Sequence, residues 1–140
     1  MEFILDNQLD NDSAFIADMT LCRLQLMNDE QYPWLILVPR RENIVEMYEL
    51  SKSDQRQLWE EIALISQLMK KLFSPHKLNI GALGNIVRQL HIHVIARNTD
   101  DKAWPGPVWG AHPTLAYQQE HQQKTIDNII QELKAQNLIA

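Results

Sequence analysis

A chain of 140 residues with 45% apolar residues is long enough to bury one hydrophobic core, and we expect a single domain over residues 1–140. Its one cysteine, Cys22, excludes an intramolecular disulfide and a paired-cysteine zinc site, and it fits a reducing compartment. A formal net charge of −5 argues against a long nucleic acid as a partner but is compatible with small anionic ligands.

The N-terminal residues are acidic where a signal peptide is basic. No apolar run reaches the length that a membrane span requires. We therefore expect a cytoplasmic protein without a membrane partner.

The first half of the chain shows two strand patterns followed by a helix pattern. Residues 20–27 alternate apolar and polar side chains and predict a strand, whereas 33–40 form a strongly apolar run that predicts a more buried strand. Apolar residues at three- and four-residue spacing predict an amphipathic helix over 54–73, capped by Ser51 or Ser53.

The second half predicts two more strands and a second helix. After a Ser-Pro break, residues 77–82 predict a strand, and a turn at Gly84 leads to another strand over 87–97. Residues 98–118 lack a regular pattern and predict an irregular functional segment. The final amphipathic helix is marked by Ile126, Ile129, Ile130 and Leu133.

The strand predicted over 87–97 carries the chemistry of the chain. Alternation places Gln89, His91 and His93 on one face. The opposite face is wholly apolar and suits packing beneath a helix. Because two imidazoles without hydrogen-bond partners are costly to bury, we expect the Gln/His/His row to lie on an open face that binds an anion.

Within this strand, QLHIHVI at 89–95 resembles the histidine triad (HIT) motif, His-φ-His-φ-His-φ-φ, with Gln89 in place of the first histidine. Upstream, LNIGALGNIV is similar to the family's Asn-x-Gly … Gly-Gln-x-Val segment. In this comparison Asn79 matches the asparagine, and Asn85 stands where glutamine is usual. LILVPRR at 35–41 also resembles the family's strand that ends in a Val-Ile-Pro-Lys type of sequence.

The resemblance implies an α+β fold with an antiparallel sheet of about five strands and two main helices, assembled as a homodimer. It also implies a nucleotidyl hydrolase or transferase acting on the α-phosphate of a dinucleoside polyphosphate, as a diadenosine polyphosphate hydrolase does, or of a nucleoside phosphoramidate. In that chemistry His91 attacks phosphorus and carries a transient nucleotidyl group, while His93 contacts the phosphate and helps the leaving group depart. The scheme requires no metal and no cofactor.

Further residues are expected to contact the nucleotide. His93, Gln89, Asn85 and the backbone amides near Gly84 are candidate donors to the charge that develops on phosphate oxygens. The family binds ribose hydroxyls with an acidic residue before the apolar strand, whose nearest match here is Asn28 or Asp29. The predicted substrate-binding residues are Asn79, Gly84, Asn85 and Asn28.

Two other functions remain open. Gln89 forms hydrogen bonds but cannot carry a proton as histidine does, which predicts an altered rate or substrate choice and allows a nucleotide-binding module with little or no turnover. A His-x-His pair on a strand is also half of a zinc or iron site. Candidates to complete such a site are His112, His121, Asp100 and Asp101, although their spacing does not demand it.

The tryptophans and one arginine have structural interpretations. Trp34 and Trp59 are expected to pack in the core. Trp104 and Trp109, in AWPGPVWG, either stack on a base or close a dimer interface, and packing is slightly favoured. Arg97 is expected to be surface charge.

Overall fold

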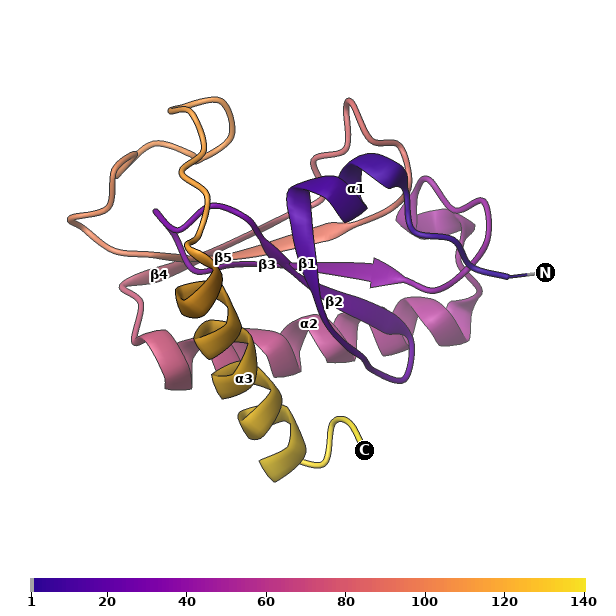
Figure 1. Cartoon of the computed structure of the whole chain (residues 1–140). Coiled ribbons are helices and arrows are strands. Elements are labelled where there is room, and N and C mark those ends of the chain that lie inside the picture. Colours follow the sequence, from indigo (N-terminus) through magenta and orange to yellow (C-terminus); the bar gives the residue numbers. More distant parts are fainter. Residues whose placement is uncertain (1) are drawn as a thin grey trace.

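A computed structural model describes residues 2–140 and contains a five-stranded sheet with two main helices (Figure 1). The strand order is β1-β2-β3-β5-β4, and every neighbouring pair is antiparallel. The predicted α+β class is therefore confirmed. The strands are β1 (Ser13–Asp18), β2 (Cys22–Met27), β3 (Trp34–Pro39), β4 (Lys77–Gly81) and β5 (Ile92–Arg97). The helices are α1 (Asn7–Asp12), the 3-10 turn η1 (Met47–Glu49), α2 (Lys52–Phe73) and α3 (Gln119–Ala135).

β3 lies in the middle of the sheet and is buried along its whole length. In Figure 1, α2 runs along one face of the sheet, while α1 and the irregular segment 98–118 lie on the other. Leu35 and Leu37 pack in the cluster on the α2 side, whereas Ile36 and Val38 pack in the cluster that includes Leu9 of α1. A strand covered on both faces has no need of polar residues, which explains the continuous apolar run.

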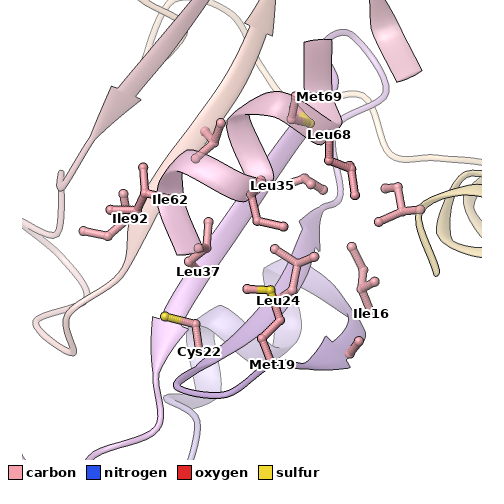
Figure 2. Packing of buried hydrophobic residues seen from close by; sticks show 14 of the residues in the cluster. Ile16, Met19, Cys22, Leu24, Leu35, Leu37, Ile62, Leu68, Met69 and Ile92 are labelled. Atoms are coloured by element: carbon pink, nitrogen blue, oxygen red, sulfur yellow. The ribbon is translucent and has the colours of Figure 1, made fainter. Parts of the chain in front are cut away.

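The apolar stripe of α2 packs against the sheet, as its spacing predicts. Figure 2 shows Ile62, Leu68 and Met69 beside Leu35 and other residues of the strands. The helix begins after Ser51, whose hydroxyl accepts a hydrogen bond from the Asp54 backbone N–H at 3.1 Å. Ser51 rather than Ser53 is therefore the cap.

The core position predicted for Trp59 is wrong. Its side chain is 65% exposed, whereas the preceding Leu58 is fully buried. Each residue turns about 100° around a helix from its neighbour, and position 59 falls outside the buried stripe.

Glu61 on α2 is 2% exposed and holds the turn between β1 and β2. Its two carboxylate oxygens accept hydrogen bonds from the backbone N–H groups of Leu21 at 2.9 Å and Cys22 at 2.8 Å. We expect Glu61→Gln to lower the free energy of unfolding by about 2 kcal/mol, because the amide N–H₂ would face a buried donor. Urea denaturation measures the loss, and the exposed neighbour supplies the control Glu60→Gln. Equal unfolding midpoints for the two variants would contradict this role.

Two segments differ from the sequence-based expectation. The residues before 20, for which no element was predicted, form α1 and β1. β5 begins at Ile92 rather than at residue 87, because the preceding backbone bonds outside the sheet: the Leu90 N–H donates to Ile44 O at 2.9 Å. His91 thus stands immediately before the strand.

The remaining helix is as predicted. α3 buries Ile126, Ile129 and Leu133, and an ion pair between Lys71 and Glu132, at 2.7 Å, links it to α2. Within residues 2–140, no helix has both the length and the apolar character needed to cross a bilayer.

Candidate active site

His91 and His93 come together at the start of β5, with their ring centroids 5.0 Å apart. The open face expected for them is wrong, since His91 is only 4% exposed and His93 only 3%. That face of the sheet is covered by α1 and the segment 98–118 (Figure 1). Both imidazoles nevertheless line a pocket, so they are enclosed by protein but adjacent to a space that a ligand can fill.

Hydrogen bonding fixes the tautomer of His91. Its Nδ1 lies 2.7 Å from the backbone oxygen of Gln89. Because a carbonyl oxygen only accepts, Nδ1 carries the proton and donates. The neutral ring therefore has a free lone pair on Nε2, the atom required of a nucleophile.

His93 is held in the opposite tautomer. The indole Nε1–H of Trp34 donates to His93 Nδ1 at 2.9 Å, which leaves the ring proton on Nε2, 3.3 Å from the carbonyl oxygen of Leu83. Burial, reinforced by the neighbouring His91, lowers the pKa of His93 to about 4. His93 is therefore a neutral hydrogen-bond donor at pH 7.

The low pKa of His93 predicts a pH-dependent stability. Between its folded pKa of about 4 and the ordinary value of 6.5, the unfolded chain binds a proton at this position that the folded chain excludes. The free energy of unfolding is therefore not reduced by this group above pH 6.5, and it decreases as the pH falls towards 4. We expect this to cost about 2 kcal/mol between pH 7.5 and pH 5. Urea unfolding at both pH values should show a smaller difference for His93→Gln than for the wild type, and an equal difference would contradict the assignment.

The pocket beside the two histidines has a volume of about 360 Å³ and mostly apolar walls. Leu9 of α1, Met27 of β2 and Trp34 of β3 contribute to one part of the wall, and Val108 and Trp109 of the irregular segment contribute to another. Enclosing aromatic and aliphatic walls suit a flat organic group such as a base.

Asp29, rather than Asn28, lines this pocket. Its Oδ1 accepts hydrogen bonds from Gln31 N at 3.0 Å and from Leu115 N at 3.4 Å. Within residues 2–140, the hydrogen bonds to this carboxylate all end on Oδ1 and leave Oδ2 free. Asn28 instead accepts from the Tyr117 backbone N–H at 2.9 Å. Both side chains thereby fasten the end of the segment 98–118 to the turn after β2.

A second hollow, of about 430 Å³, shares His91 and Asn85 with the first. It is lined on its other sides by Tyr48 of η1 and by Arg88, both exposed. His91 therefore stands between two spaces of different character. The first has apolar walls with two carboxylates, Asp12 and Asp29, whereas the second includes one cation, Arg88, and one carboxylate, Glu46.

Gly84 lies close to the ring of His91. A Cβ atom at this position would lie 2.5 Å from the backbone oxygen of Val87 and 3.2 Å from Cε1 of His91. The turn can therefore pass the imidazole at this distance only because residue 84 has no side chain.

The side-chain amides of Gln89 and Asn79 are both engaged in hydrogen bonds within the protein, although Gln89 also lines the second hollow. The carboxamide of Gln89 bonds to the backbone of Ile4 and Asp6. The amide oxygen of Asn79 accepts a hydrogen bond from Arg97 at 2.8 Å, and Asn79 is not among the residues lining either hollow. Of the predicted substrate-binding residues, the structure brings only Gly84 and Asn85 beside the histidines.

Arg97 is not surface charge, which corrects the expectation from sequence. Its side chain is 1% exposed and pairs with Asp101 at 2.8 Å. Trp104 lies over its guanidinium at 5.6 Å, away from the pocket. This cluster anchors the start of the segment 98–118 to β4 and β5.

Trp34 and Trp109 belong to the site. The ring of Trp109 meets that of His93 edge-on with centroids 5.3 Å apart, and Trp34 donates to the same imidazole. A tryptophan at the start of an apolar strand gives no sequence signal that it bonds to a histidine 59 positions later. Within residues 2–140, no three His, Cys, Asp or Glu side chains gather in a group suited to a metal ion.

Comparisons with known proteins agree with the motif. A family model described as the HIT domain matches residues 8–100. A histidine triad protein from Sinorhizobium meliloti 1021 is 46% identical, with 92% of this chain and 96% of that chain covered and a TM-score of 0.90. One from Bradyrhizobium japonicum is 42% identical (94% and 98% covered, TM-score 0.91), and one from Marinobacter aquaeolei VT8 is 43% identical (99% and 100%, TM-score 0.92). No curated protein matches at a significant level.

Proposed function

Because this chain belongs to the histidine triad family, we propose that it is a nucleotidyl hydrolase or transferase in which His91 attacks the α-phosphorus of a nucleotide-containing substrate. The observation that carries the proposal is the hydrogen bond from His91 Nδ1 to Gln89 O, which leaves Nε2 free to attack. Dinucleoside polyphosphates and nucleoside phosphoramidates are the proposed substrate classes.

In the first step, the Nε2 lone pair forms a bond to the α-phosphorus while the bond from phosphorus to the leaving group breaks. The leaving group departs with that electron pair and takes up a proton from solvent. In the second step, water attacks the phosphorus and gives up a proton to solvent. The N–P bond breaks with its electron pair returning to Nε2, and a nucleoside monophosphate leaves His91 free. The Nε2–H of His93 and the amide of Asn85 are the proposed donors to the phosphate oxygens.

The two hollows suggest where the two parts of a substrate lie on either side of His91. The nucleoside is assigned to the apolar pocket, where the free Oδ2 of Asp29 would accept a hydrogen bond from a ribose hydroxyl. The leaving group is assigned to the side of Arg88, since an anion is repelled less where Arg88 offsets the one carboxylate, Glu46, than beside Asp12 and Asp29.

Intact-mass spectrometry after brief mixing with a panel of adenosine and guanosine polyphosphates and phosphoramidates tests this function. A mass increase of one nucleoside monophosphate, or its release as free product, supports covalent catalysis and identifies the base. The absence of both an adduct and a released product across the whole panel would overturn the proposal.

One observation favours a second candidate, a nucleotide-binding module with little turnover. Burial holds the pKa of His93 at about 4, and Gln89 cannot carry a proton, so neither residue brings an imidazolium to a leaving group at pH 7. Calorimetric binding of AMP by a protein that releases no AMP from any substrate would establish this alternative.

The family resemblance also supports a homodimer. β4 is at an edge of the sheet and bonds only to β5 among the described strands, and its Ile80 is 46% exposed. Light scattering at micromolar protein should give twice the chain mass of 16.3 kDa. A monomer would refute the assignment.

A further inference from the structure

The side chain of Gln89 is bound at both of its amide atoms by the N-terminal arm, residues 2–6. The Asp6 backbone N–H donates to Gln89 Oε1 at 2.8 Å, and Gln89 Nε2 donates to Ile4 O at 2.9 Å. The carboxamide thus bonds to the arm as a peptide group of a neighbouring strand would. We call this pair of hydrogen bonds the clasp. It joins residues more than 80 positions apart.

The backbone of the same residue orients the nucleophile. Gln89 O accepts the proton of His91 Nδ1 at 2.7 Å, and the next backbone N–H, of Leu90, donates to Ile44 O at 2.9 Å. The carbonyl that determines the His91 tautomer is therefore held on one side by the clasp and on the other by the chain before η1.

We infer that Gln89 is a positioning residue whose side chain acts through the N-terminal arm and not on the substrate. The clasp fixes the Gln89 carbonyl, and the carbonyl keeps the His91 proton on Nδ1. The inference rests on the proposed function, because it is in that reaction that a free Nε2 matters.

The chemistry of glutamine suits this role. One planar group offers a donor to Ile4 O and an acceptor to the Asp6 N–H, and it keeps both at every pH at which the protein folds. A protonated imidazole offers donors alone and would leave the Asp6 N–H without an acceptor. Glutamine therefore makes the clasp independent of pH.

A matched pair of variants at position 6 isolates the clasp. Asp6 also caps α1, since its carboxylate accepts from Gln8 N at 2.8 Å, and both Asp6→Ala and Asp6→Pro lose that cap. Only proline also removes the backbone N–H that bonds to Gln89, and the Asp6 φ of −54° is one that proline adopts. We expect kcat about 10-fold lower for Asp6→Pro than for Asp6→Ala, with KM little changed. Equal kcat values would overturn the inference.

Combining Asp6→Pro with Gln89→Ala tests whether the two residues act together. If the Gln89 side chain acts through the arm, this double variant loses no more activity than Asp6→Ala combined with Gln89→Ala, which lacks the same cap. If Gln89 acts directly on the substrate, the two losses multiply, and the inference fails.

The ¹⁵N chemical shifts of the His91 ring supply a measurement that needs no turnover. We expect the Nδ1–H form alone in the wild type and a mixture of tautomers in Gln89→Ala and in Asp6→Pro. If the His91 tautomer is unchanged in both variants, the inference is overturned even when the enzyme is active. A wild type without turnover that still shows the expected shifts would instead count against the proposed function alone.

Discussion

His91→Ala is expected to form no nucleotidyl adduct and to lose at least about 10³-fold in kcat, since the atom that bonds to phosphorus is gone. The variant should still fold. The imidazole lines a pocket, and its loss leaves the Gln89 carbonyl next to space that water can enter. Single-turnover assays with intact-mass detection measure the activity, and circular dichroism monitors the fold.

His76→Ala is the matched control, because His76 is exposed and packs its ring against Trp104, outside the pocket. It should retain wild-type turnover. Adduct formation on His91→Ala would reject His91 as the nucleophile.

Gly84→Ala should reduce kcat about 100-fold without altering any group that takes part in the chemistry. The added Cβ would lie 2.5 Å from Val87 O, so the turn must shift, and His91 Cε1 at 3.2 Å lies in its path. Displacing a reacting atom by about 1 Å is enough for a loss of this size. Steady-state kinetics should show the effect mainly in kcat.

Gly81→Ala is the control for that variant. A Cβ atom at position 81 would meet no backbone atom within 4 Å, and its nearest neighbour is Cη2 of Trp109 at 3.4 Å, an ordinary contact. We expect activity within a few-fold of the wild type. If Gly84→Ala is as active as Gly81→Ala, the close approach of residue 84 to His91 does not matter for activity.

The sequence predicts the sheet and the two long helices because their signals are local. Apolar spacing along 54–73 and alternation along 20–27 record directly which side of each element packs in the core. α1 and β1 are not predicted because their local signals are weak. α1 has only six residues, and β1 contains a bulge between Phe15 and Ala17 that interrupts its alternation.

The two histidines are found from sequence because they stand two positions apart in a recognisable motif. The environment of the two histidines cannot be found from sequence, because it depends on contacts between distant parts of the chain. The bond from Trp34 to His93 and the bonds from Gln89 to the arm each cross more than 50 positions. Arg97 shows the same limit, since a charged residue at a strand end looks exposed until Asp101 and Asn79 are brought beside it.

The attachment of residues 113–117 to the turn after β2 bears on the affinity of the pocket. Gln31 donates to Pro113 O at 3.0 Å, and the backbone of Glu30 donates to Leu115 O at 2.7 Å, so a stretch without helix or strand is nonetheless held in place. A wall already ordered in the free protein loses little conformational entropy when a ligand arrives. More of the contact energy with the nucleoside is then retained as affinity, although the wall is built from irregular chain.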